Sequence, residues 1–180
     1  MKLKRLTKTA IIPTRGSEGA AGYDLYADSV EGEFALTEEG SIIAASGANL
    51  KVHTGIALAI PKGYVGLVFA RSGLACKQGL RPANCVGVID EDYRGEIIVN
   101  LYNDINLKHI LDNLSDEDAK KVENIIGNVK TLHEDFAEIK VGERCAQIVF
   151  VQYLAEDFEE VDELDDTDRG EGGFGSTGTH

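Results

Sequence analysis

The sequence predicts an all-β protein, and two features of the chain support this prediction. Short apolar runs of Val, Ile and Leu are separated by turn residues, and the chain contains 20 glycines. This pattern is typical of strands joined by turns. Hydrophobic residues make up 43% of the 180 residues, which is enough to form a core and argues against a disordered chain.

The first strands are expected at regular intervals along the chain. Residues 22–27 alternate, so Leu25 and Ala27 should lie on one face of a strand and Asp24 on the other. A loop or short helix is expected at residues 71–75. The predicted strands before it cover residues 1–12, 22–27, 50–60 (one strand or a bent pair) and 64–70.

Two further strands, at residues 85–89 and 96–102, flank a turn at residues 90–95, and we predict a hairpin there. Another strand is expected at residues 145–151. Strands at this spacing favour a closed or sandwiched β domain, which we place at residues 1–155.

Residues 104–139 interrupt the β pattern. Ser115 followed by Asp118 resembles a capping box at the start of a helix. Apolar residues then recur at helical spacing between positions 122 and 129. We therefore predict a small helical insertion in the β domain.

Residues 156–180 form a predicted flexible arm. Its first part is dense in acidic residues and poor in apolar ones, as in a solvated linker. The Gly-rich end carries Arg169 and Phe174, and a purely disordered terminus, which is the alternative, needs neither. An arm that closes over a nucleotide would use the Phe to stack on the base and the Arg to bind phosphates.

Net charge and cysteine content exclude several classes of function. The formal net charge is -13, so direct nucleic-acid binding and binding to anionic membranes are not expected. The cysteines, Cys76, Cys85 and Cys145, include no CxxC pair, which argues against a zinc site and a disulfide scaffold. No apolar stretch is long enough to span a bilayer, and a cytoplasmic protein is expected.

Asp90 and Arg71 are candidates for chemistry. Asp90 follows an apolar run at the base of the predicted hairpin, where a carboxylate either takes a proton from an attacking water or caps turn N–H groups. Arg71, followed by Ser72 and Gly73, suits phosphate oxygens but also a surface salt bridge. Each segment taken alone favours the structural alternative.

Asp24 is either a metal-linked carboxylate or a polar residue on an outer strand face, and Arg144 and Gln147 frame a strand start. The histidines, His53 among them, have no metal-ligand spacing and are expected at the surface or at sheet edges. No Ser/His/Asp or Cys/His arrangement stands out, so covalent catalysis is not expected.

Five segments set polar groups among glycines and small residues. They are AGYDLYAD (21–28), RSGLA (71–75), GVIDEDYRGE (87–96), GERCAQIVF (142–150) and RGEGGFGSTG (169–178). In this order they resemble the five motifs of the trimeric dUTPase family, the deoxyuridine triphosphate diphosphatases. Together they extend nearly from end to end of the chain and leave only the insertion uncovered. Any one is a weak signal, but five in order at compatible spacing are specific and override the structural alternatives.

The resemblance implies a jelly-roll-like barrel of the β-clip type and a homotrimer whose active sites are each shared by all three chains. Residues 156–168 would carry the last motif to a neighbour's site. The implied reaction is Mg²⁺-dependent hydrolysis of dUTP to dUMP and pyrophosphate. Asp90 would be the general base that activates water for in-line attack on the α-phosphorus.

The roles of individual residues follow from their motif positions. Backbone groups around Asn84, Val88 and Ile89 would bind the uracil edge, and Tyr93 would pack under the sugar and exclude a 2′-OH. Asp24 would contact Mg²⁺ directly or through water, while phosphate and water oxygens hold most of the ion. The remaining contacts to the base and the triphosphate would come from Arg71, Ser72, Gly73, Gln147, Arg169, Phe174, Gly175, Ser176 and Thr177.

The chain departs from the family pattern at two places. Ala70 precedes Arg71, where many relatives have Pro. The insertion at 104–139 is absent from compact cellular enzymes and resembles the extra segment of dUTPases from staphylococcal phages, which as a group also bind a repressor of mobile pathogenicity islands. The resemblance implies a surface for such a repressor protein, and an inert elaboration of the barrel is the alternative.

Two other functions stay open at this point. A dCTP deaminase shares the fold, but it needs an acid/base residue near C4 of the base, and no free carboxylate beyond Asp90 is evident. Tyr93, shortly after Asp90, also favours the dUTPase. The second is a nucleotide-gated regulatory binding protein without catalysis, against which the intact motifs argue.

Overall fold

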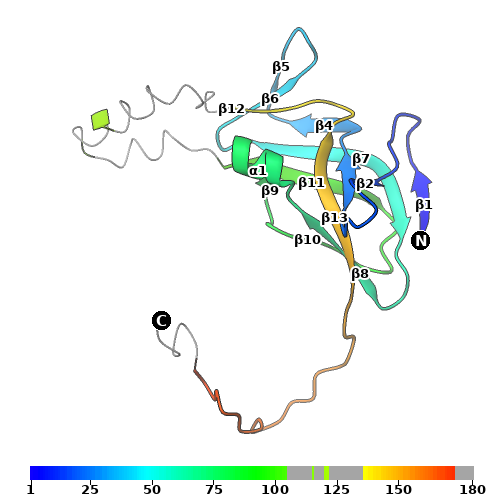
Figure 1. Cartoon of the computed structure of the whole chain (residues 1–180), viewed down its shortest axis with the longest axis vertical. Helices are drawn as coiled ribbons and strands as arrows, with labels where there is room; N and C mark the ends of the chain where they lie inside the picture. The colour runs from blue at the N-terminus through cyan, green and yellow to red at the C-terminus, as the bar shows by residue number, and fades with distance from the viewer. Residues whose placement is uncertain (105–114, 116–119, 122–135, 173–180) are drawn as a thin grey trace.

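The computed structural model describes residues 1–104, 115, 120–121 and 136–172, and it contains three antiparallel sheets and one short helix (Figure 1). Sheet A has the order β1-β7-β11-β9, with β4 also paired to β7, and sheet B the order β10-β8-β13-β3-β2. Sheet C has the order β12-β6-β5.

The bounds of the elements are as follows. Sheet A contains β1 (Lys2–Arg5), β4 (Ser29–Gly32), β7 (Asn49–Ala59), β9 (Leu80–Pro82) and β11 (Glu96–Asn103). Sheet B contains β2 (Thr14–Arg15), β3 (Tyr23–Tyr26), β8 (Tyr64–Phe69), β10 (Gly87–Ile89) and β13 (Arg144–Gln152). Sheet C contains β5 (Ala35–Leu36), β6 (Ile42–Ala45) and β12 (Phe136–Ile139), and the helix α1 covers Ser72–Gln78.

The core is one apolar cluster to which all three sheets contribute, with Ile42 and Ile139 coming from sheet C. Strand β11 alternates between buried and outward-facing residues, and its buried Leu101 joins one apolar cluster with Leu25 of β3 and Ile148 of β13. All three side chains are 0% exposed. Each such burial stabilises the fold by about 1.5–3 kcal/mol. The all-β prediction and the jelly-roll-like architecture are therefore confirmed.

The predicted hairpin at residues 90–95 is wrong. Strand β10 pairs with β8 in sheet B, whereas β11 pairs with β7 and β9 in sheet A. Residues 90–95 therefore cross from one sheet to the other. Both flanking strands exist, but local alternation carries no information about which distant strand each one joins.

Two strand boundaries also differ from expectation. The first strand ends at Arg5, and the chain does not pair again until β2. The stretch at 50–60 is a single strand, β7, which bends at Gly55, where φ is +65°. A Cβ at Gly55 would lie 2.7 Å from the Thr7 hydroxyl, so glycine is required there for space as well as for conformation.

Only parts of the predicted insertion and arm are described. Phe136–Ile139 forms β12 against β6, so the chain returns to β structure earlier than expected. The predicted helix falls mostly at 105–114, 116–119 and 122–135, outside the described residues, and stays a prediction. After β13 the chain runs away from the sheets, and residues 153–171 are exposed (Figure 1). Within the described part of the chain, no helix is both long and apolar enough to cross a membrane.

Candidate active site

Asp24 lies at the centre of a polar cluster on sheet B. Its side chain, which is 14% exposed, extends from β3 near the start of β13 and the end of β8. One carboxylate oxygen accepts a hydrogen bond from Arg71 Nε at 3.0 Å, and the other accepts one from Arg144 Nη1 at 3.4 Å. The carboxylate therefore anchors two guanidinium groups at one place.

Gln147 joins this cluster through the sheet register. It lies opposite Asp24 in the β13–β3 pair and opposite Phe69 in the β13–β8 pair. Its Nε2 donates a hydrogen bond to the carbonyl of Ala70, directly before Arg71, at 2.9 Å. A Cβ at Gly22 would lie 2.8 Å from Gln147 Oε1, so a side chain at Gly22 would displace the amide.

Ser72 and Gly73 form the first turn of α1, immediately after Arg71. N–H groups in the first turn of a helix have no partner within that helix. No acidic side chain lies in this turn, and a Cβ at Gly73 would meet no atom within 4 Å. Two guanidinium groups, a hydroxyl and an open backbone thus converge, and this combination suits phosphate oxygens.

Asp90 follows β10 and is exposed. Its carbonyl accepts a hydrogen bond from the N–H of Tyr93 at 3.2 Å, which closes a turn. Next to it, the Glu91 carboxylate accepts a hydrogen bond from the N–H of Gly63, and Arg94 Nη1 donates to the Glu91 carbonyl at 2.6 Å. These contacts order the connection and leave the Asp90 carboxylate exposed to a ligand.

The Asp90 carboxylate and the Asp24 cluster lie near opposite ends of β8. Because Ile89 pairs with Gly66, Asp90 lies beside the start of β8, whereas Arg71 follows its end. Five residues along the chain, from Gly66 to Arg71, correspond to roughly 16 Å of strand. A single chain therefore does not bring the candidate base to the polar cluster around Asp24.

The segment before β10 exposes its backbone. Cys85 has a φ of +63°, the left-handed region that non-glycine residues rarely adopt. The N–H of Val86 donates to the carbonyl of Asn84 at 2.7 Å, so the chain turns tightly here. Asn84 and Val88 are both exposed. A planar ring could therefore approach this turn from solvent.

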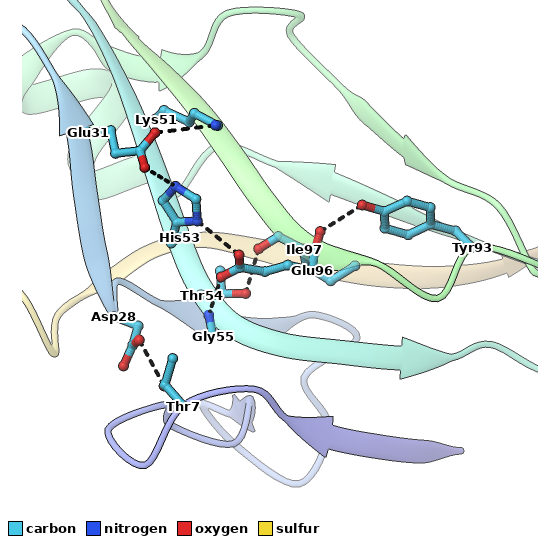
Figure 2. A network of polar contacts seen from close by, with 10 residues as sticks. All are labelled: Thr7, Asp28, Glu31, Lys51, His53, Thr54, Gly55, Tyr93, Glu96 and Ile97. Carbon is cyan, nitrogen blue, oxygen red and sulfur yellow. Dashed lines mark hydrogen bonds and ion pairs between the residues drawn. The ribbon is translucent and has the colours of Figure 1, made fainter.

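A polar network that the sequence pattern does not indicate lies next to Tyr93 (Figure 2). His53, expected at the surface or at a sheet edge, is only 17% exposed and lies between Glu31 and Glu96. The hydrogen bond to Glu96 raises the pKa of His53. Local sequence holds no signal for this network, because Glu96 is 43 positions away from His53 along the chain.

The residues of the site do not form a cage for a resident metal ion. Among the described residues, no group of three or more His, Cys, Asp or Glu side chains could hold one. Both oxygens of Asp24 already accept hydrogen bonds from arginines. Burial raises the pKa of Cys145 to about 12, so this thiol stays protonated and is a poor ligand or nucleophile.

The last motif is described only at its beginning. Arg169 is exposed, and its Nε donates to the carbonyl of Gly172 at 2.8 Å. The structure thus brings together Asp24, Arg71 and Gln147, and it places Asp90 elsewhere. The other predicted site residues of this motif lie outside the described residues: Phe174, Gly175, Ser176 and Thr177.

The fold and the cluster define a β-rich protein suited to a phosphorylated ligand. The dUTPase family model matches residues 8–111 and 107–178. A deoxyuridine 5'-triphosphate nucleotidohydrolase of Dictyoglomus turgidum is 38% identical over 176 residues, covering 98% of this chain and 96% of the relative. One from Corynebacterium glutamicum is 40% identical over 178 residues, covering 99% and 94%. The chain belongs to the dUTPase family.

Solved structures of phage dUTPases have the same fold. The dUTPase of Staphylococcus bacteriophage 80alpha with dUPNHPP superimposes with a TM-score of 0.73 at 28% identity, covering 99% of this chain and 98% of that one. A dUTPase of phage phi11 of S. aureus, whose structure concerns the coordination of a structural Mg(II) ion, superimposes with a TM-score of 0.65 at 22% identity, covering 91% and 97%.

Proposed function

We propose that the protein hydrolyses dUTP to dUMP and pyrophosphate. The observation that carries this proposal is the cluster in which Asp24 anchors Arg71 and Arg144 beside Gln147 and the open first turn of α1. A triphosphate needs several cationic and N–H donors at one place, and this cluster supplies them. Membership of the dUTPase family and the activity named for the relatives support the choice of dUTP.

In the proposed reaction, the Asp90 carboxylate takes a proton from a water molecule. The water oxygen forms a bond to the α-phosphorus, in line with the leaving group. The bond from that phosphorus to the oxygen bridging the α- and β-phosphates breaks, and pyrophosphate leaves with this oxygen. Arg71, Ser72 and Gln147 would bind the phosphates, so catalysis rests on positioning and charge neutralisation.

The proposed active site is shared between chains of a homotrimer. Within one chain, Asp90 and Arg71 lie near opposite ends of β8, too far apart to act on one phosphorus. The exposed arm supports the same idea, because Leu154, Phe158 and Leu164 have at least 79% of their surface exposed and would be covered by a neighbour. Arg169 and the Gly-rich end of the arm would then complete the neighbour's site.

Recognition of the nucleoside is assigned to the two segments that flank β10. The tight turn at Asn84, with Val88 and Ile89 after it, would bind the uracil edge through backbone groups. Tyr93, which is 43% exposed, would pack under the deoxyribose and exclude a ribose 2′-OH. Phe174 would cover the uracil from the arm.

Mg²⁺ is proposed to arrive with dUTP rather than to reside in the protein. Phosphate and water oxygens would hold it, as is usual for Mg²⁺ in nucleotide sites. Asp24 is the proposed protein contact, directly or through water. Its arginine partners would then change position when Mg–dUTP binds.

A second role in binding a repressor protein is proposed for the insertion. Phage dUTPases similar to this chain are described as controlling the transfer of virulence genes by a G protein-like mechanism. The insertion follows β11 along the chain, and its last residues form β12. If bound dUTP controls this contact, a non-hydrolysable dUTP analogue should weaken the binding of the purified pathogenicity-island repressor. An unchanged affinity for the repressor would show that dUTP does not control its binding.

The activity is tested by pyrophosphate release from dUTP, dCTP, dTTP and UTP with Mg²⁺, for the wild type and Asp90→Asn. We expect release from dUTP alone and a loss of about 10²-fold or more on substitution, as for other positioned bases. Ammonia released from dCTP would indicate a deaminase instead. No turnover of any nucleotide would favour a purely regulatory protein, and full activity of Asp90→Asn would remove Asp90 as the base.

A further inference from the structure

The side chain of Glu96 binds two groups of the neighbouring strand β7 (Figure 2). Its Oε1 accepts a hydrogen bond from the N–H of Gly55 at 2.8 Å, and its Oε2 lies 2.9 Å from Nδ1 of His53. The Glu96 side chain is 21% exposed and that of His53 is 17% exposed. A mostly buried carboxylate with two such partners has a fixed position.

These contacts lie where the backbone ladder between β7 and β11 is irregular. The register shifts between Glu96 and Ile98, and β7 bends at Gly55, where φ is +65°. Side-chain hydrogen bonds join the two strands at this irregular point. In addition to the Glu96 contacts, the Thr54 hydroxyl donates to the carbonyl of Ile97 at 2.6 Å. The start of β11 is thus held by side-chain contacts at the point where the connection at residues 90–95 joins it.

The Tyr93 side chain also contacts the start of β11. Its hydroxyl donates a hydrogen bond to the carbonyl of Glu96 at 3.0 Å (Figure 2). A Cβ at Gly95 would lie 2.4 Å from the Tyr93 hydroxyl oxygen, so the ring packs directly on this glycine. Any movement of Glu96 therefore changes the direction of the Tyr93 ring, whose other side is exposed.

Two carboxylates contact the His53 ring from opposite neighbouring strands. Glu96 contacts it from β11, Glu31 from β4 at 3.4 Å, and Lys51 of its own strand pairs with Glu31 at 3.3 Å. The hydrogen bond to Glu96 raises the pKa of His53, so the imidazolium persists to higher pH than in an isolated histidine.

We propose that Glu96, held by His53 and the Gly55 N–H, is a positioning residue that sets the orientation of Tyr93 and thereby the preference for deoxyribose over ribose. The inference rests on the proposed hydrolysis of dUTP and on the place of Tyr93 under the sugar. It assigns a role in sugar specificity to Glu96 and His53, which lie outside the cluster around Asp24.

The test compares kcat/KM for dUTP and UTP in the wild type, Glu96→Gln and His53→Gln. We expect both variants to lower the dUTP/UTP ratio about tenfold, through KM rather than kcat, as loss of one charge-assisted hydrogen bond predicts. The wild-type ratio should fall as pH rises through the His53 titration, and it should be independent of pH in His53→Gln. Glu31→Gln is the matched control, because it removes the other carboxylate and leaves the Glu96 contacts intact.

Tyr93→Phe completes the experiment, because it removes the hydroxyl that contacts Glu96. The dUTP/UTP ratio of kcat/KM in Tyr93→Phe should match that in Glu96→Gln. The double variant with both substitutions should have the same ratio as either single variant. Equal losses of kcat/KM for both nucleotides, or a ratio unchanged in Glu96→Gln but lowered in Tyr93→Phe, would overturn the inference. A wild type that releases no pyrophosphate from dUTP would instead overturn the proposed function, and the two failures are distinguishable.

Discussion

At the scale of single residues, the contacts of Asp24 determine how the phosphate-binding cluster is built. The hydrogen bond from Arg71, at 3.0 Å, contributes about 1.5–3 kcal/mol, whereas the longer contact from the half-exposed Arg144 is screened by solvent and contributes about 1 kcal/mol or less. The sequence placed Asp24 and Arg71 in separate motifs, and both motifs lie in the cluster. Their contact could not be predicted, because the two residues are 47 positions apart and meet only through the strand order β8-β13-β3.

The substitution Asp24→Asn tests this anchoring role. It keeps the size of the side chain but removes its charge, so Arg71 and Arg144 lose their common partner. We expect the KM for dUTP to rise about tenfold, because the arginines are no longer anchored. The Mg²⁺ concentration for half-maximal rate should rise as well, because Asp24 is also the proposed protein contact to Mg²⁺. Steady-state kinetics across a Mg²⁺ titration measure both. An unchanged KM would contradict the anchoring role, and an unchanged Mg²⁺ requirement would contradict the proposed metal contact.

At the scale of elements, the strands were predictable and their partners were not. Alternation located β3, β8 and β13 to within about two residues, because each buries one face. The sequence predicts a hairpin at residues 90–95, since two strands close in sequence usually pair. Here Val88 pairs with Leu67 and Val99 with Val52, and such distant pairing is encoded in packing rather than in local pattern.

The pairing of β4, β7 and β11 should depend on pH through His53. Its pKa is raised in the folded protein, so its ion pairs stabilise the fold fully below the unfolded value, about 6.5. This stabilisation is lost as pH rises through the folded value. Between pH 6 and pH 9, the urea midpoint of the wild type should therefore fall more than that of His53→Gln at equal chain concentration. Parallel curves would contradict the assignment.

At the scale of the whole molecule, one chain alone does not assemble the proposed active site. Its candidate base and phosphate cluster are separated, and its arm carries large apolar side chains in solvent, with Phe158 at 105% relative exposure. The acidic composition of the arm predicts a solvated linker, and this stays a prediction for the assembled protein, since residues 153–171 are exposed in the single chain only. No pattern within one chain could show what covers its apolar residues, because the covering surface would belong to another copy.

The exposed apolar residues of the arm should contribute to the stability of the assembled trimer. If a neighbour covers Phe158 and Leu164, replacing both with Ser removes about 1.5–3 kcal/mol of apolar burial for each chain and residue. We expect a fall of several degrees in Tm by calorimetry at fixed chain concentration. The matched control, Glu159→Gln with Glu163→Gln, should leave Tm nearly unchanged. An equal Tm for both double variants would mean that the arm stays in solvent.

The most direct test of a shared dUTPase site mixes two inactive proteins. Asp90→Asn chains keep an intact Arg71, and Arg71→Ala chains keep an intact Asp90. If the two residues of one site come from different chains, random equimolar trimers contain both intact residues in about one quarter of their sites. Co-refolded mixtures should then recover about a quarter of the wild-type rate of pyrophosphate release from dUTP. Mixtures as inactive as their parents would place both residues in one chain and contradict the account.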